Sequence, residues 1–199
     1  LYLARDPAND LASLAAALPT QAAINAASNG LLKQAMVAVS GFKSGLAVAA
    51  NLSIGGFDTH GNHDGNHIPQ LGTLLAGIDL IMTEITNAGL QNKVVIAVGS
   101  DFGRTPAYNA QNGKDHWNIT SMMFMGPGIA GGRVVGGTDA TFKAKTFNPA
   151  TLAEDPNGIR IKPEHIQKAL RELAGVADSD PARQFPLSPA TQCLRLFMP

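Results

Sequence analysis

The sequence contains a single cysteine, Cys193, so no disulfide can form within the chain, and its redox compartment is left open. It has no excess charge of either sign, because 15 basic and 15 acidic side chains balance. A neutral chain lacks the excess of basic residues that is typical of a nucleic-acid-binding protein. The sequence also predicts no basic helix of the kind that binds a membrane surface. No uninterrupted apolar run approaches the roughly 20 residues of a membrane span. We therefore expect no nucleic-acid partner and no membrane-spanning segment.

Length and composition indicate a globular chain that is rich in loops. With 199 residues, 45% of them hydrophobic, the chain can bury a core, and we expect one α/β domain over residues 1–199. Charged residues make up 15%, below the roughly 25% of most soluble domains, whereas 21 glycines and 12 prolines predict many tight connections. The chain starts at Leu1 rather than at a methionine, so we expect any targeting signal to have been removed or to lie outside it.

A strand, a helix and a second strand are predicted in the middle of the chain. Residues 46–54 form an apolar, alanine-rich run that ends at Gly55-Gly56, as a buried parallel strand would. Apolar residues on one helical face follow over 66–88, with Gly89 in the position of a C-terminal cap, and 93–98 is β-branched and apolar. This order predicts a βαβ unit with parallel strands and a right-handed crossover. Ligands bind at the carboxyl ends of such strands.

Further elements are expected on either side of this unit. They are predicted from helical spacing, proline and glycine positions and short apolar runs. These are helices over 11–18 and 20–39, the second weakened at Asn29-Gly30, a strand over 121–125, a hairpin or edge element over 133–135, a loop over 138–160, a helix over 163–173 and an extended tail.

The segment from residue 55 to 67 is the densest in potential ligands, since it holds three of the five histidines and two aspartates. Asp58 and His60 are two residues apart, so in an extended segment their side chains point to the same side and can share one ion. A carboxylate with an imidazole suits Zn²⁺, Mn²⁺ or Fe²⁺ better than Ca²⁺. The alternative is a loop pair in which Asp58 caps a turn and His60 lies on the surface.

Two further histidines follow in the same segment. His63 and His67 are four residues apart and would align on a helix, which would allow either to be an additional ligand. We favour the alternative that they are solvated loop histidines, because such spacing is a weak signal. Asp64 is expected to cap a turn or the start of the helix.

A second polar segment follows the second predicted strand, over residues 99–106. Asp101 comes directly after an apolar run, and a buried carboxylate there needs a partner, either a metal ion or Arg104. The guanidinium of Arg104 offers a planar fork of donors that suits phosphate, sulfate or carboxylate. Arg104 therefore either binds an anion or forms a simple salt bridge with Asp101, and the sequence favours neither alternative.

A third polar segment, over residues 113–117, contains Asp115 and His116. Adjacent residues of an extended segment point to opposite sides, so only one of them reaches the metal, and we choose His116. Asp115 is then a partner of a ligand or an anchor of the loop. Thr59 and Ser100 are weak candidates for a nucleophile, because neither has an evident base beside it.

Four segments together resemble a bacterial family, domain of unknown function 1501. The resemblance covers about residues 30–139 and leaves residues 140–199 as a loop-rich tail. The segments are Gly-Gly-Phe-Asp-Thr-His at 55–60, Ser-Asp-Phe-Gly-Arg-Thr-Pro at 100–106, Gly-Lys-Asp-His-Trp at 113–117 and Gly-Gly-Arg-Val-Val-Gly-Gly-Thr-Asp at 131–139.

That family is similar to the alkaline-phosphatase-like superfamily of phosphatases, sulfatases and phosphomutases. The resemblance implies an α/β fold with a mostly parallel sheet and helices on both faces, of which this chain is the C-terminal portion. Members typically carry a twin-arginine export signal, which implies a periplasmic or secreted protein. The N-terminal remainder of the same protein is expected as a partner of this chain.

By resemblance, Asp58 and His60 take the place of an aspartate and histidine ligand pair, Asp101 of the aspartate that ends a strand, and His116 of the last histidine ligand. The chain departs from the superfamily at Phe102, where the phosphatases have a ligating histidine and the sulfatases an asparagine. By the same resemblance, the early segment that carries the nucleophile lies on a first strand that is expected to precede this chain. One divalent ion is therefore expected, Zn²⁺ first, with Mn²⁺, Fe²⁺ or Ca²⁺ as alternatives. A second ion would need ligands from outside this chain.

The function that the resemblance implies for the full-length protein is metal-dependent hydrolysis of phosphate or sulfate esters, with a small anionic ester as substrate. Arg104 and Asp115 would belong to the catalytic machinery, Arg104 by holding the anion. The alternative is a non-catalytic exported relative that binds an anionic or carbohydrate ligand or a protein partner, and Phe102 favours it. An isomerase of the phosphomutase type has no residue here that selects it.

Overall fold

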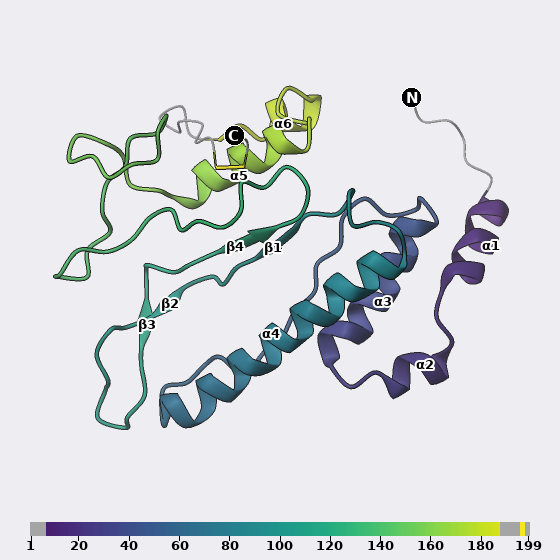
Figure 1. Cartoon of the computed structure of the whole chain (residues 1–199), viewed down its shortest axis with the longest axis horizontal. Coiled ribbons are helices and arrows are strands. Elements are labelled where there is room, and N and C mark those ends of the chain that lie inside the picture. Colours follow the sequence, from purple (N-terminus) through teal and green to yellow (C-terminus); the bar gives the residue numbers. More distant parts are fainter. Residues whose placement is uncertain (1–6, 188–195, 198–199) are drawn as a thin grey trace. The chain divides into compact units, whose positions relative to one another are not determined.

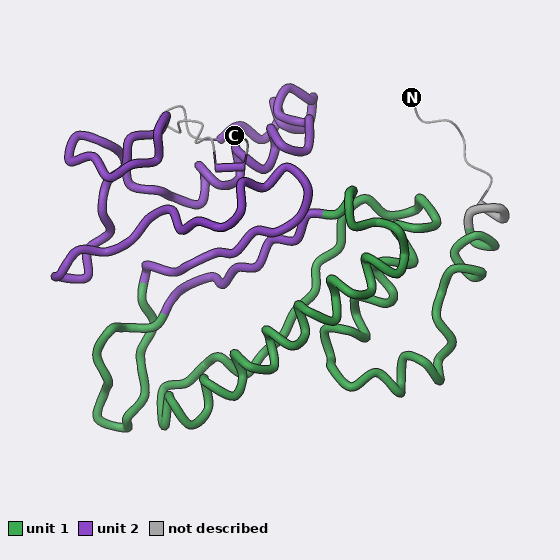
Figure 2. Tube along the Cα trace, in the orientation of Figure 1, with its two compact units in different colours: residues 1–94, 104–117 green, residues 95–103, 118–199 purple. Residues whose placement is uncertain are grey.

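The chain forms two compact units (Figure 2). The computed structural model describes residues 7–187 and 196–197. The first unit comprises residues 1–94 and 104–117, and the second comprises residues 95–103 and 118–199. The three potential ligands at positions 58, 60 and 116 belong to the first unit, as does Arg104, whereas Asp101 belongs to the second.

Four helices make up most of the first unit (Figure 1). The helix predicted over 20–39 is divided at Asn29, which caps the second part by accepting the backbone N–H of Leu31 at 2.8 Å. The amide of Asn29 also donates to the carbonyl of Thr73 at 3.1 Å, so the same side chain ties two helices together. The helices are α1 (Pro7–Ala17), α2 (Gln21–Ala26), α3 (Gly30–Lys43) and α4 (His63–Asn87).

The core of the first unit lies between α3 and α4, which run side by side (Figure 1). A Cβ on Gly77 would lie 2.7 Å from Leu31 Cδ1, so glycine at this position allows the two helices to approach closely. The apolar side chains of this core are Leu31, Ala35 and Val39 from α3 and Ile78 and Ile85 from α4.

The helix α4 is covered by α3 over only part of its apolar face. Ile85 is 3% exposed, whereas Leu75 and Ile68, about three and five turns earlier in the same helix, are 55% and 62% exposed. With 25 residues of this composition, α4 is long and apolar enough to cross a membrane by length and hydropathy alone. Within the first unit, its side chains Ile78 and Ile85 lie in the core.

The strand predicted over residues 46–54 is wrong, because this segment has no regular secondary structure. Side-chain amides take the place of a neighbouring strand. Gln34 donates to the carbonyl of Ser53 at 2.8 Å and accepts its N–H at 2.9 Å, and Gln70 donates to the carbonyl of Gly55 at 2.5 Å. An apolar sequence favours a strand, but a strand forms only where a neighbouring strand can share backbone hydrogen bonds with it.

Each of the two sheets described has two short strands. In the second unit, β1 (Ile96–Val98) pairs with β4 (Met123–Met125) antiparallel, with Ile96 opposite Met125. The other sheet joins β2 (Gly103–Arg104) to β3 (His116–Trp117). The strands predicted over 93–98 and 121–125 are confirmed in shortened form. The mostly parallel sheet with helices on both faces stays a prediction.

In the C-terminal part of the second unit, the residues that the structure describes contain two helices, α5 (Pro163–Leu173) and α6 (Asp180–Gln184). The bounds predicted for α5 are confirmed. The extended tail is wrong over α6, where Ser179 caps the helix and accepts the N–H of Ala182. The edge element predicted over 133–135 is also not formed. Core side chains of this unit are Phe147, Ile166, Ala169 and Phe197.

Candidate metal centre

The backbone at Asp58, Thr59 and His60 presents alternate side chains to opposite sides. Asp58 and His60 are exposed, whereas Thr59 between them is buried with 4% of its surface accessible. The carbonyl of Thr59 accepts the N–H of Lys114 at 3.1 Å, which fixes this segment beside the one that carries His116. The alternation predicted from the spacing of Asp58 and His60 is therefore present.

Three potential ligand atoms meet at the exposed side of this segment. His60 Nε2 lies 3.0 Å from Asp58 Oδ1, His116 Nε2 lies 3.3 Å from the same oxygen, and the two histidine nitrogens are 3.1 Å apart. Within the part of the chain that the structure describes, these residues form the group of histidines and carboxylates that converges closely enough to hold a metal ion. We refer to Asp58, His60 and His116 as the ligand triangle.

The spacing and chemistry of the ligand triangle fit a transition-metal ion. Bonds of about 2.0–2.1 Å in a tetrahedral site hold neighbouring ligand atoms about 3.3–3.4 Å apart, close to the observed 3.0–3.3 Å. Two histidines with one carboxylate also form the ligand set of many catalytic zinc sites, which keep a fourth position open. Ca²⁺ fits poorly, because it prefers six to eight oxygen ligands.

Asp115 orients His60 from the side opposite the triangle. Its Oδ1 lies 2.9 Å from His60 Nδ1, so a proton on Nδ1 leaves the lone pair of Nε2 directed at Asp58 and His116. Hydrogen bonds from His60 and Asn109 hold the pKa of the Asp115 carboxyl below its ordinary value. A carboxylate behind a ligating histidine is the usual arrangement in metal sites, where it fixes the tautomer of the ring.

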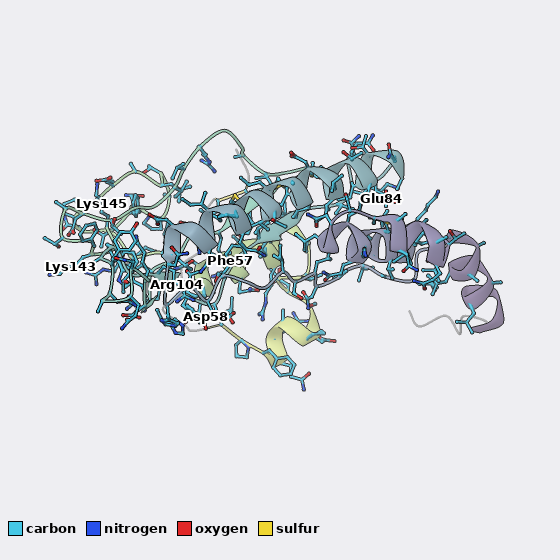
Figure 3. All side chains as sticks on the ribbon, turned by 90° about the horizontal axis from the view of Figure 1, so that it is seen from below. Phe57, Asp58, Glu84, Arg104, Lys143 and Lys145 are labelled. Atoms are coloured by element: carbon cyan, nitrogen blue, oxygen red, sulfur yellow. The ribbon has the colours of Figure 1, made fainter. Side chains whose placement is uncertain are left out.

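Arg104 lies against the same group of acceptors (Figure 3). Its Nη2 is 2.7 Å from Asp58 Oδ1, and its Nη1 is 3.0 Å from the carbonyl of Lys114 and 3.4 Å from His60 Nε2. The guanidinium, and next His116, lower the pKa of the Asp58 carboxyl. The side chain of Arg104 is 11% exposed, whereas that of Asp58 is 74% exposed, so the cation is packed beneath an open carboxylate.

A tight loop between Arg104 and His116 places both residues. Thr105 N–H donates to the carbonyl of Asp115 at 2.9 Å, and Asn109 donates to the carbonyl of His60 at 3.0 Å and to Asp115 Oδ1 at 3.1 Å. A Cβ on Gly113 would collide with the carbonyl of His60, so only glycine allows the two backbones to come this close. Sequence reasoning missed Asn109 and Gly113, although Gly113 opens one of the four segments that carry the family resemblance.

A second pair of histidines lies behind the ligand triangle and is closed off. The rings of His63 and His67 stack with centroids 4.4 Å apart, and the hydroxyl of Thr59 lies 2.7 Å from His63 Nδ1 and 3.4 Å from His67 Nδ1. Burial lowers the pKa of both imidazoles. The prediction of solvated loop histidines is wrong for His63, which is 9% exposed in the first turn of α4.

The remaining predicted ligand, Asp101, is not a member of the ligand triangle. It is exposed, so water can hydrate its carboxylate, and the buried position from which a metal partner was argued is wrong. Asp101 belongs to the second unit, whereas the triangle belongs to the first, and its role as a metal ligand stays a prediction. The ion pair that the structure describes for Arg104 is with Asp58.

The family model "Protein of unknown function (DUF1501)" matches residues 6–155, about three quarters of the chain. The chain belongs to this family. Comparison with curated proteins and with solved structures found no match. The DUF1501 match extends further than the predicted range of 30–139, contains the whole ligand triangle with Arg104 and Asp115, and ends before α5.

Proposed function

We propose that this protein is a metal-dependent hydrolase of phosphate or sulfate esters that is related to the alkaline-phosphatase-like superfamily. The observation that carries the proposal is the ligand triangle with a guanidinium beside it. Zn²⁺ is the first choice of ion, and Mn²⁺ or Fe²⁺ also suit two imidazoles and a carboxylate. An export signal outside this chain and a periplasmic location belong to the same proposal.

The charge of the cluster favours an anionic substrate once an ion is bound. Asp58 and Asp115 with Arg104 leave a formal charge of −1 when the imidazoles are neutral, and a divalent ion changes this to +1. The ion would polarise an ester oxygen and stabilise the charge that develops on it. Arg104 would hold a non-bridging oxygen of the ester, and Asp115 would keep His60 in the orientation that the ligand needs.

Water is the nucleophile in this proposal, because the candidate hydroxyl near the triangle faces away from it. Thr59 now has a base within hydrogen-bond distance, His63, but its hydroxyl is buried between two imidazoles on the opposite side of the backbone. The products of hydrolysis would be the alcohol and the free phosphate or sulfate. The ester bond breaks between the transferred group and the alcohol oxygen, which takes a proton.

The same inward-facing hydroxyl favours a second candidate function, a non-catalytic exported protein that binds an anion. In that case the metal and Arg104 would form a binding site for phosphate, sulfate or an acidic sugar, and no group would activate a nucleophile. Phe102, 38% exposed, also supplies no ligand where the superfamily has one. The two candidates share the metal site and differ in turnover.

Turnover of chromogenic esters by the Zn²⁺-loaded, full-length protein separates the two candidates. We expect release of 4-nitrophenol from 4-nitrophenyl phosphate or 4-nitrophenyl sulfate that stops when the ion is removed by a chelator and returns when it is restored. Metal binding without turnover of either ester, together with binding of inorganic sulfate, would support the second candidate. Absence of stoichiometric metal binding would reject both.

A further inference from the structure

The guanidinium of Arg104 occupies the acceptor atoms that a metal ion would need. It reaches Asp58 Oδ1 with Nη2 at 2.7 Å and His60 Nε2 with Nη1 at 3.4 Å, so it bridges two of the three corners of the ligand triangle. A guanidinium has donors and no acceptor, so this contact requires the lone pair of His60 Nε2. An ion ligated by His60 requires that same lone pair.

The ion and the guanidinium therefore exclude each other at His60. An imidazole nitrogen has one lone pair and accepts one partner, either the N–H of Arg104 or a metal ion. Two cations at the same carboxylate oxygen of Asp58 would also repel each other. Arg104 stays beside the site after its displacement, because its Nη1 is also held by the carbonyl of Lys114 at 3.0 Å.

We propose that a bound divalent ion displaces Arg104 from Asp58 and His60 and that the released fork then donates to a tetrahedral oxyanion, so that metal and anion bind with positive coupling. The inference rests on the proposed metal site. The change in cluster charge from −1 to +1 acts in the same direction, since the ion converts a site that repels anions into one that attracts them. The coupling is reciprocal, so an oxyanion must raise metal affinity by the factor by which the metal raises oxyanion affinity.

The coupling predicts an unusual effect for removal of a charged side chain. Arg104→Gln removes the competitor for Asp58 and His60, so Zn²⁺ should bind more tightly than in the unaltered protein when no oxyanion is present. The same substitution removes the donor fork, so sulfate should no longer increase the affinity for Zn²⁺. A residue that only holds Asp58 in place would show the opposite change in metal affinity.

The test is calorimetric titration of the 199-residue chain with Zn²⁺ in chloride buffer, with and without sodium sulfate at equal ionic strength. For the unaltered protein we expect sulfate to lower the Kd for Zn²⁺ about 5-fold or more, the lower end of typical coupling. For Arg104→Gln we expect a lower Kd without sulfate and a sulfate effect within about 2-fold of none. Arg160→Gln, which changes an exposed arginine of the second unit that donates to a backbone carbonyl, is the matched control and should behave as the unaltered protein.

The outcomes separate this inference from the proposed function. If Zn²⁺ binds the unaltered protein and sulfate leaves its Kd unchanged, the coupling is wrong and the metal site stands. If Arg104→Gln weakens Zn²⁺ binding, Arg104 positions Asp58 and does not compete with the ion. If Zn²⁺ does not bind at all, both proposals fail. The sulfate effect on the unaltered protein needs no variant, so it decides the question even if Arg104→Gln fails to fold.

Discussion

Two pairs of histidines belong to the first unit, and their surroundings give them different chemistry. His60 and His116 are half-exposed, with side chains 46% and 51% accessible, and their Nε2 atoms converge on a carboxylate. His63 and His67 stack on each other, and both Nδ1 atoms face the hydroxyl of Thr59. The comparison shows that the imidazoles on one side of the Thr59 backbone converge with a carboxylate, whereas those on the other side contact the hydroxyl of Thr59.

The buried pair, His63 and His67, helps to hold the exposed pair, His60 and His116, in place. We call these the closed pair and the open pair. Thr59 is held by the first two turns of α4 through its side chain and by Lys114 through its carbonyl. Asp58 and His60 flank this anchored residue, so their direction is set by contacts on the far side of the backbone. Ligands held by locked neighbours keep their geometry before an ion arrives.

The sharpest way to break the comparison is to remove one histidine from each pair. His60→Ala takes away a ligand, and we expect the Kd for Zn²⁺ to rise more than about 100-fold, beyond the effect of losing an outer-shell partner. His67→Ala leaves the triangle complete, and the Kd should stay within a few-fold of the unaltered value. Calorimetric titration measures both. Equal losses would show that the two pairs form one site.

Glycine positions test how closely the loop must approach the triangle. Gly113→Ala places a methyl group against the carbonyl of His60, and we expect the free energy of unfolding to fall by about 1–3 kcal/mol or more, with loss of metal affinity. The matched control is Gly72→Ala on the exposed face of α4, where a Cβ meets nothing. That change should raise the free energy of unfolding by about 0.5–1 kcal/mol. Chemical denaturation compares the two, and a tolerated Gly113→Ala would contradict the close approach.

The hydroxyl of Thr59 tests whether the closed pair supports the open one. Thr59→Val keeps the shape but leaves imidazole nitrogens buried without this partner, so we expect a loss of about 1–3 kcal/mol in unfolding free energy. Metal affinity should fall by a smaller factor than in His60→Ala. Thr59→Ser retains the hydroxyl and should restore much of both quantities. A valine variant with unchanged metal affinity would show that Asp58 and His60 are oriented without the closed pair.

The smallest expected effect is the pH dependence of stability. Burial lowers the pKa values of His63, His67 and His165 below the ordinary 6.5, so these imidazoles are neutral in the folded state. Because the unfolded chain then binds more protons, stability is full above about pH 6.5 and falls as the pH drops through the folded pKa values. Thermal unfolding from pH 8 to pH 5 should show this decline. A Tm that rises on acidification would contradict the sign.

Substitution of His165 removes the contribution of this histidine of the second unit to the pH dependence of stability. Its Nδ1 accepts the backbone N–H of Lys162 at 2.9 Å at the start of α5, which requires the neutral ring. Glutamine at this third helical position can accept the same N–H and does not titrate in this range. His165→Gln should therefore flatten part of the pH dependence without a large change in Tm at pH 8.

Several features of the fold and the site were predictable because they depend on near neighbours in sequence. The two-residue spacing of Asp58 and His60 placed both on one side of the backbone, and the proline at the start of α5 marked that helix. The same alternation predicts His116 rather than Asp115 as the ligand, and the structure places His116 at the triangle with Asp115 behind His60. The weak point predicted at Asn29-Gly30 is where the structure divides the helix, and Asn29 caps α3 there.

Other predictions failed where the outcome depends on distant parts of the chain. The run over 46–54 has strand-like composition, but Gln34 and Gln70 satisfy part of its backbone in place of a partner strand. Asp101 follows an apolar run, yet the strand before it is only partly buried and its carboxylate is open to water. Burial and pairing are properties of the assembled chain, so composition alone cannot decide them.

By itself, the sequence determined which residues carry potential metal ligands and which neighbours share a side, because side-chain direction repeats every two residues in an extended segment. The tertiary structure decided that Asp58 and His60 meet His116 from 56 positions further along, with Arg104 on the same acceptor atoms. It also decided that Thr59 turns inward against His63 and His67. These outcomes require a loop closed by Gly113 and Asn109, and such closure depends on the space between backbones that only the folded chain defines.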